Sequence, residues 1–302
     1  MEAAMEKKNM EIQAINHQTI GQRLKSYKRS PLSLVLLLLV SVSALLTVLT
    51  LLFLIAYILI KGIPYLTPSL FAWEYNSENV SLMPALVNTV IMTGLSLLIA
   101  VPLGIFAAIY LVEYARRGNK IVEIVRITAE TLTGIPSIVY GLFGFLLFGV
   151  ALKWGYSMLG GALTLAIMIL PTIMRTTEEA LKSVPDSYRE GSFGLGAGRL
   201  RTVFQVVLPS AVPGILAGVI LAVGRIVGET AALMYTAGTV AGIPANIMGS
   251  ARTLSVHMYV LTNEGLYTNQ SYATAVVLLV IVVLINALSG FIAKKITGKG
   301  IG

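Results

Sequence analysis

The sequence has 302 residues, of which 56% are hydrophobic and 12% are charged, and its mean hydropathy is +0.82. Soluble domains average roughly 45–50% apolar and about 25% charged residues, so this composition excludes an ordinary soluble domain and indicates a membrane protein. The chain has no cysteine and only two histidines, which excludes disulfides, thiolate catalysis and cysteine-based zinc sites. We therefore expect no catalytic residue, no metal site and no cofactor.

Apolar segments in chain order predict six membrane spans, because crossing a bilayer takes about 20 residues at a rise of 1.5 Å each. One of them is interrupted by Pro136 and by glycine and serine residues that favour close helix packing. The predicted spans are 32–60, 86–110, 133–152, 158–174, 212–232 and 273–292. The expected fold is an all-α membrane protein with a polar basic tail, 1–31, and a transmembrane domain, 32–302. The first span is expected to remain as an anchor, since no small-residue cleavage site follows it.

The basic residues predict the orientation, because short loops rich in Lys and Arg stay in the cytoplasm. Eighteen of the 22 Lys and Arg residues fall in four stretches: 1–31, 116–126, 175–201 and the tail after Ile292. This distribution predicts that both termini are cytoplasmic. The net charge of +8 then reflects topology and contact with lipid headgroups, and no nucleic-acid partner is expected.

The loop 183–209 has the pattern of a helix, a turn and an amphipathic helix. Pro185 ends the preceding element, and Ser187 followed by Glu190 has the form of a capping box, predicting a short helix to about Leu195. Three glycines then permit a sharp turn. Apolar residues next recur at helical spacing, with Arg199 and Arg201 on the polar side: Leu200, Val203, Phe204, Val207 and Leu208. The alternative is a solvated helical connector without a partner.

This loop resembles the signature of type I ABC importer permeases, which reads Glu-Ala-Ala, three residues, Gly, nine residues, Ile, one residue, Leu-Pro. The same spacing is present here, with Gly and Ser in place of the two alanines and Val in place of Ile. The matching residues are Glu190, Gly191, Ser192, Gly196, Val206, Leu208 and Pro209. The resemblance implies that the short helix docks on a cytoplasmic ATPase, that Gly196 provides the turn, and that Tyr188 and Arg189 share the coupling surface.

No phosphate-binding Gly-x-x-x-x-Gly-Lys-Ser/Thr loop occurs in the sequence, so ATP hydrolysis is expected in a partner and not in this chain. The stretches 134–144 and 224–233 are similar to the permease pair of phosphate importers, and 253–260 with 272–275 is more similar to PstA than to PstC. This implies a PstC-like permease partner, two PstB-like ATPases, an external PstS-like phosphate-binding protein, and phosphate as cargo. A PstC-type subunit and a permease for sulfate or molybdate are the alternatives.

Charged residues within spans mark candidate positions along a transport path, because a charge at depth is costly and faces a cavity or a partner. Arg225 and Glu229 are four residues apart, and Arg175 and Glu178 are one turn apart at the cytoplasmic end of the fourth span. Arginine suits an oxyanion because its planar group donates two parallel hydrogen bonds. We expect Arg225, with Arg175, to line the path; structural ion pairs are the alternative.

Two further expectations concern the outer loop and the rival classes of protein. His257 is predicted to be a surface histidine in a long outer loop that gates the path or receives the binding protein. A secondary transporter is disfavoured because no inverted second half is evident, and an intramembrane enzyme because no nucleophile and base pattern occurs.

Overall fold

The computed structural model describes residues 31–116 and 118–298, and in these residues it contains helices, turns and loops but no strand. The all-helical prediction is therefore confirmed, while the basic tail 1–30 lies outside the described residues. The chain forms two units, 1–57 and 58–302. The described part of the first unit belongs to α2 (Pro31–Gly62), which is apolar almost throughout.

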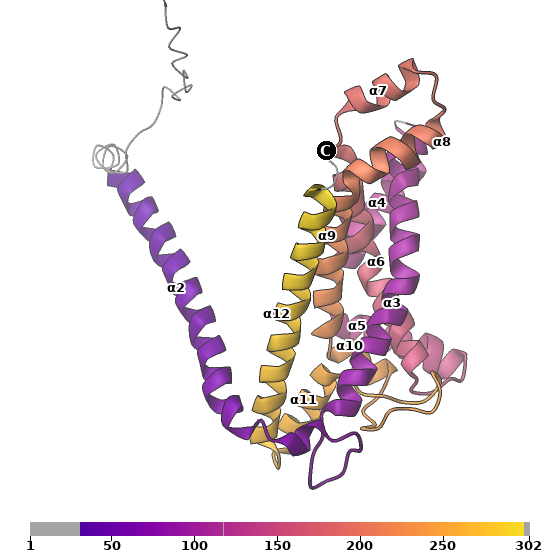
Figure 1. The fold of residues 1–302 in the computed structure, drawn as a ribbon. Coiled ribbons are helices and arrows are strands. Elements are labelled where there is room, and N and C mark those ends of the chain that lie inside the picture. The colour runs from indigo at the N-terminus through magenta and orange to yellow at the C-terminus, as the bar shows by residue number, and fades with distance from the viewer. Residues whose placement is uncertain (1–30, 117, 299–302) are drawn as a thin grey trace, which may run out of the picture. The chain divides into compact units, whose positions relative to one another are not determined.

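The second unit contains the remaining helices, coloured from violet to yellow in Figure 1. They are η1 (Ile63–Tyr65), η2 (Pro68–Phe71), α3 (Met83–Ile109), η3 (Tyr110–Tyr114), α4 (Lys120–Thr133), α5 (Ser137–Gly144), η4 (Phe145–Ala151), α6 (Met158–Lys182), α7 (Asp186–Gly194), α8 (Arg199–Thr202), η5 (Val203–Val207), α9 (Leu208–Val227), α10 (Ala231–Thr236), α11 (Leu254–Glu264) and α12 (Thr268–Gly298). Figure 1 shows α7 and α8 at one end of this unit and α11 at the opposite end. We call these the α7 end and the α11 end.

In the part of the chain that the structure describes, five helices are long and apolar enough to cross a membrane, and a bent pair makes a sixth crossing if it is counted as one span. The second half of the bent pair, α5 with η4, lies where the sequence predicts the span 133–152. Helix α4 precedes that range, and it meets α5 and η4 at an angle of 104°. The break has a local cause, because Pro136 cannot donate a helical hydrogen bond and holds an extended backbone at ψ 140°.

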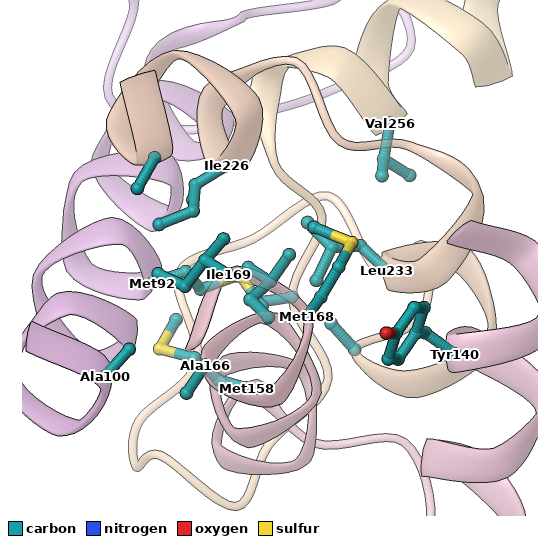
Figure 2. Packing of buried hydrophobic residues seen from close by; sticks show 14 of the residues in the cluster. Met92, Ala100, Tyr140, Met158, Ala166, Met168, Ile169, Ile226, Leu233 and Val256 are labelled. Atoms are coloured by element: carbon teal, nitrogen blue, oxygen red, sulfur yellow. The ribbon is translucent and has the colours of Figure 1, made fainter. Parts of the chain in front are cut away.

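The core of the second unit lies around α6, whose buried face packs against α3, α5, α9 and α10 (Figure 2). Close approach of α3 and α6 depends on Gly104, where a Cβ atom would lie 2.8 Å from Cγ2 of Ile173. Small residues at such contacts are how membrane helices gain packing energy, since lipid tails are as apolar as the side chains. A second apolar cluster at the α7 end joins α3, α6 and η5 through Ile109, Leu181 and Val207.

Candidate coupling and transport site

The predicted short helix is α7, and it begins at Asp186, directly after Pro185. The capping box predicted from Ser187 and Glu190 is wrong, because Ser187 lies inside the first turn and no side chain caps this terminus. Pro185 holds an extended backbone at ψ 140°, so the helix starts at the next residue, and Asp186 places a negative charge in the first turn, where the helix dipole favours it.

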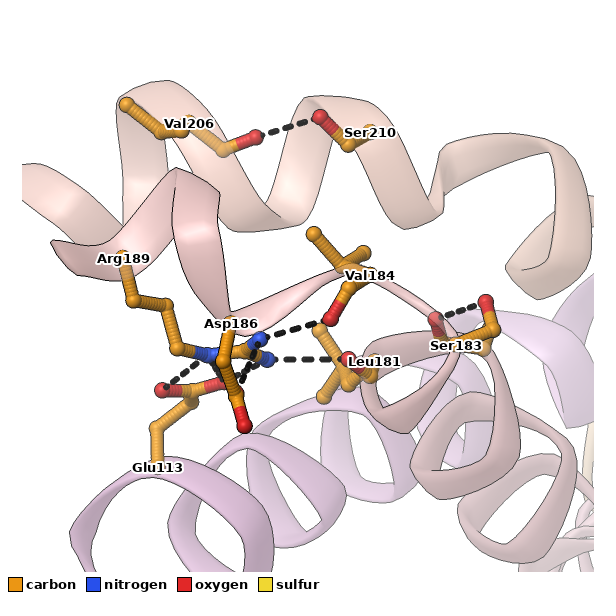
Figure 3. Close-up of polar contacts among 9 residues, drawn as sticks. Glu113, Leu181, Ser183, Val184, Asp186, Arg189, Val206 and Ser210 are labelled. Atoms are coloured by element: carbon orange, nitrogen blue, oxygen red, sulfur yellow. Dashed lines mark hydrogen bonds and ion pairs between the residues drawn. The ribbon is translucent and has the colours of Figure 1, made fainter. Parts of the chain in front are cut away.

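Arg189 points from α7 into the protein and binds three elements (Figure 3). Its Nη2 lies 2.7 Å from a carboxylate oxygen of Glu113 in η3, and only 15% and 9% of the two side chains are exposed. Its guanidinium also donates to the carbonyl of Leu181 (2.9 Å) at the end of α6 and to that of Val184 (2.8 Å) in the segment between α6 and α7. A weaker contact of 3.3 Å reaches Asp186. Arg189 therefore ties α7 to the ends of both α3 and α6.

The other side chains of α7 are mostly exposed, and they include both apolar and charged groups. Tyr188 and Phe193 are half exposed, and Leu195 after the helix is 92% exposed. Glu190 and Gly191 are also exposed, and Glu190 forms no ion pair within the described part of the chain. Exposed large apolar side chains grouped on one short helix are typical of a protein interface.

The turn after α7 depends on Gly196, whose φ is +82°. Its N–H donates to the carbonyl of Phe193, and the N–H of Ala197 donates to the carbonyl of Ser192, which together form a Schellman motif. The hydroxyl groups of Ser192 and Thr202 lie 2.8 Å apart and connect α7 to α8. The hairpin of α7 and α8 is thus closed by both backbone and side-chain hydrogen bonds.

The second helix of the hairpin continues through α8, η5 and α9 as one helix from Arg199 to Val227. A π-helical segment, η5, comes directly before Leu208 and Pro209, where the proline lacks a backbone donor. The predicted apolar face is correct for Val203 and Val207, which are buried, but wrong for Leu200, which is 65% exposed.

Arg175 and Glu178 do not pair with each other, which corrects the predicted pairing. Nε of Arg175 lies 3.2 Å from Glu179, while Glu178 accepts from Arg126 at 2.7 Å and from Lys182 at 2.6 Å. The i, i+4 geometry along α6 outcompetes the i, i+3 pair, and α4 supplies the other cation. These residues, with Glu130, line a cavity of about 260 Å³ between α4 and α6.

Arg225 and Glu229 do not share a helix face, because α9 ends at Val227 and Gly228 caps it. The structural ion pair, which was one of the two alternatives for these residues, is therefore wrong. Glu229 is 8% exposed, and its carboxylate instead accepts from the backbone N–H of Ala232 at 3.0 Å, at the start of α10. Within the described residues neither Arg225 nor Glu229 forms an ion pair, so both charges are held in partly or fully buried positions without a counter-ion.

His257 is fully buried in α11, so its predicted surface position is wrong. It lies at the α11 end, and its ring meets the ring of Tyr75 edge to face, with centroids 6.1 Å apart. Burial and the nearby guanidinium of Arg252 lower the pKa of His257 to about 3, with the Val80 backbone acting weakly in the opposite direction. The imidazole is therefore neutral at pH 7.

Sequence reasoning missed three residues of these networks: Glu113, Arg126 and Glu130. Arg126 is the last residue of the basic stretch 116–126 and Glu113 lies shortly before this stretch, so the charge pattern indicated the region but not the ion pairs formed there. No spacing rule connects Glu113 with Arg189, which lies 76 residues further along the chain.

Residues 100–298 match the family of binding-protein-dependent transport system inner membrane components. The chain is 34% identical to the probable ABC transporter permease YqgI of Bacillus subtilis, over 82% of this chain and 91% of that protein. It is 36% identical to the phosphate transport system permease PstA 1 of Mycobacterium tuberculosis, over 70% of each chain.

Solved structures of ABC transporters share the fold. A chain of the MetNI methionine transporter superposes with a TM-score of 0.57 at 21% identity, covering 71% of this chain and 94% of the other. A chain of a bacterial alginate transporter gives 0.65 at 17% identity, covering 91% and 99%. The expected type I permease fold is confirmed. The chain therefore belongs to the binding-protein-dependent transport system inner membrane components, the non-catalytic, multi-pass permease subunits of type I ABC importers.

Proposed function

We infer that this chain is the PstA-type permease of an ATP-driven importer of inorganic phosphate. The likeness to proteins named phosphate transport permeases carries the identity of the cargo. Proteins named PstC are also similar, one of them at 30% identity over 79% of this chain. The arginines held inside the helical bundle suit an anionic cargo, because a guanidinium donates two parallel hydrogen bonds to an oxyanion.

The partners follow from this assignment. We propose that the chain pairs with a PstC-like permease, that two PstB-like ATPases bind at the α7 end, and that a PstS-like phosphate-binding protein docks at the α11 end. The α7 end is then cytoplasmic, in accordance with the Lys and Arg distribution, which also predicts cytoplasmic termini. The exposed side chains of Tyr188, Phe193 and Leu195 would enter a groove of the ATPase, with Glu190 beside them.

Coupling runs through the inward side of α7. When the ATPases close, they displace α7, and the buried contacts of Arg189 carry this movement to Glu113 on η3 and to the end of α6. The hairpin turn at Gly196 and the Ser192–Thr202 contact carry it to α8 and through Leu208 and Pro209 to α9. Three spans therefore receive the movement of one short helix.

The transport path is proposed to pass Arg225 and Glu229 at depth and then Arg175 and Glu178 toward the cytoplasm. Arg225 has no counter-ion in the described residues and can accept an anion, while buried Glu229 opposes its retention. Arg175 lines the 260 Å³ cavity together with Arg126 and three carboxylates. Because these arginines already form ion pairs with the carboxylates, they bind the anion weakly and release it readily toward the cytoplasm.

Uptake of labelled phosphate in cells lacking this chain tests the proposal. Wild-type sequence is expected to restore uptake in the presence of excess sulfate or molybdate. Glu190→Ala combined with Gly196→Val should abolish it, whereas Arg201→Gln, which removes an exposed arginine from the same hairpin, should not. Uptake that sulfate displaces would refute the cargo, and uptake that survives the double replacement would refute the coupling.

Arg225→Gln tests the path separately. Normal assembly with loss of uptake is expected, and full uptake in that variant would remove Arg225 from the path.

A further inference from the structure

Unpaired polar atoms gather at the α11 end. Within the described residues, seven buried side-chain nitrogen and oxygen atoms lack a hydrogen bond of ordinary geometry, and five of them belong to Asn88, Arg252 and His257. These side chains are 0–4% exposed. Most buried polar groups in proteins are paired, so a cluster of unpaired ones indicates a missing ligand.

The cluster is one place in the fold. The guanidinium carbon of Arg252 lies 4.6 Å from the ring centroid of Tyr75, and His257 meets the same ring edge to face. The side-chain nitrogen of Asn88 donates to the backbone carbonyls of Arg252 and Gly242 at 3.2 and 3.1 Å. Three elements thus converge here: α3, the segment before α11, and α11 itself.

The unpaired donors on Arg252 are Nε and Nη2. These two nitrogens form one edge of the planar guanidinium and direct two N–H groups the same way, which is the edge that binds an oxyanion through two parallel hydrogen bonds. No Asp or Glu among the described residues pairs with Arg252. An anion would compensate its buried positive charge.

The remaining unpaired atoms select among anions. Asn88 donates through its nitrogen to two carbonyls, so its side-chain oxygen is an acceptor that cannot be exchanged by a flip. Neutral His257 has one ring N–H, which lies near the backbone of Val80, and one ring nitrogen that can only accept a hydrogen bond. The cluster therefore needs a ligand with both oxygen acceptors and a hydroxyl donor. Phosphate at neutral pH has both, whereas sulfate and molybdate have acceptors only.

We propose that Arg252, His257 and Asn88 form an external binding site for protonated inorganic phosphate, covered by the turn that contains Tyr75 and Val80. This inference rests on the proposed function and adds a residue-level basis for preferring phosphate to sulfate at the entrance of the path.

The covering turn is held in a disfavoured conformation. Val80 has a φ of +47°, which is unusual for a β-branched residue, and such strain is found where a segment has a functional role. Asn76 and Asn79 bind backbone groups inside the turn, so it moves as one piece. Phosphate enters when this turn is displaced and Tyr75 leaves the face of Arg252.

The test measures binding of labelled inorganic phosphate to the complete importer complex without its binding protein, with sulfate as competitor. Wild type is expected to bind phosphate at least about tenfold more tightly than sulfate. Arg252→Lys, which keeps the charge but loses the parallel donors, should weaken phosphate binding about tenfold or more. Lys61→Gln, which removes an exposed positive charge elsewhere in the second unit, should leave binding unchanged.

Tyr75→Ala distinguishes loss of the site from misfolding. It uncovers the site and should strengthen phosphate binding, which a misfolded protein would not do. Adding Arg252→Lys to Tyr75→Ala should cancel that gain. All of these variants are measured in a chain that also carries Arg225→Gln, so that phosphate bound at the deeper position proposed for the path does not add to the measured binding. Binding that is indifferent to Arg252, or equal for phosphate and sulfate, would overturn the inference. If cells nevertheless show phosphate-specific uptake, the proposed function stands; if neither uptake nor binding prefers phosphate, both fail.

Discussion

Breaking the ion pair between Arg189 and Glu113 should destabilise the α7 end by different amounts depending on which partner is removed. Both side chains are largely buried, and removing one partner of a buried pair costs about 3–5 kcal/mol. After Glu113→Ala, Arg189 still donates to two carbonyls and Asp186, so we expect about 3 kcal/mol. After Arg189→Met, Glu113 has no other partner among the described residues, so we expect about 5 kcal/mol.

The double variant Arg189→Met, Glu113→Ala removes both charges and should recover much of the stability lost in Arg189→Met. It should not recover coupling, because the connection from α7 to η3 is still absent. Reconstituted complexes would be compared by thermal unfolding and by the ATP hydrolysed per phosphate imported. We expect normal co-purification of the ATPase and a raised ATP-to-phosphate ratio.

Arg201→Gln is the matched control. It removes an exposed arginine from the same hairpin, and among the described residues this side chain hydrogen-bonds to Gln205 and forms no ion pair. It should change neither quantity. An unchanged ATP-to-phosphate ratio in the double variant, with the complex assembled, would refute the transmitting role of Arg189. A larger loss of stability for Glu113→Ala than for Arg189→Met would refute the account of the pair.

Three further predictions follow from backbone geometry, packing and titration. Gly196→Ala should lower the stability of the folded protein by about 1–2 kcal/mol, because φ is +82° there, and it should also lower ATPase stimulation. Gly191→Ala, where the new Cβ atom would lie in open space, should leave stability unchanged or raise it slightly. Gly104→Leu should lower the unfolding temperature, because its side chain would force α3 away from α6. Gly94→Leu should not, because a Cβ atom there meets no neighbouring residue within 4 Å. Equal effects of the two substitutions would contradict the packing argument. The pKa of His257 is about 3 when folded and about 6.5 when unfolded, so protonation favours unfolding. Stability should therefore fall by about 1.4 kcal/mol per pH unit as the pH falls from about 6.5 to about 3. His257→Gln should flatten that slope in a pH series of unfolding curves.

Properties that depend on composition and local spacing were predictable. The apolar segments predicted the helical membrane fold, and the glycine and proline positions predicted the hairpin 183–209 with its turn at Gly196. The spacing from Glu190 to Pro209 led to the permease family without reference to any contact, because a docking helix needs its turn and its return helix at fixed distances.

Properties that depend on distant parts of the chain were not predictable. Helical spacing suggested pairs between Arg225 and Glu229 and between Arg175 and Glu178, but a helix end at Val227 separates the first pair, and α4 supplies a competing partner to the second. The same limit applied to His257, which looks like a loop histidine until the turn at Val80 is seen to cover it. The local sequence pattern determined which elements form. Only the packing of these elements decided which charges are paired, which are buried alone and where an anion can bind. These properties depend on neighbouring elements, about which the spacing along one helix carries no information.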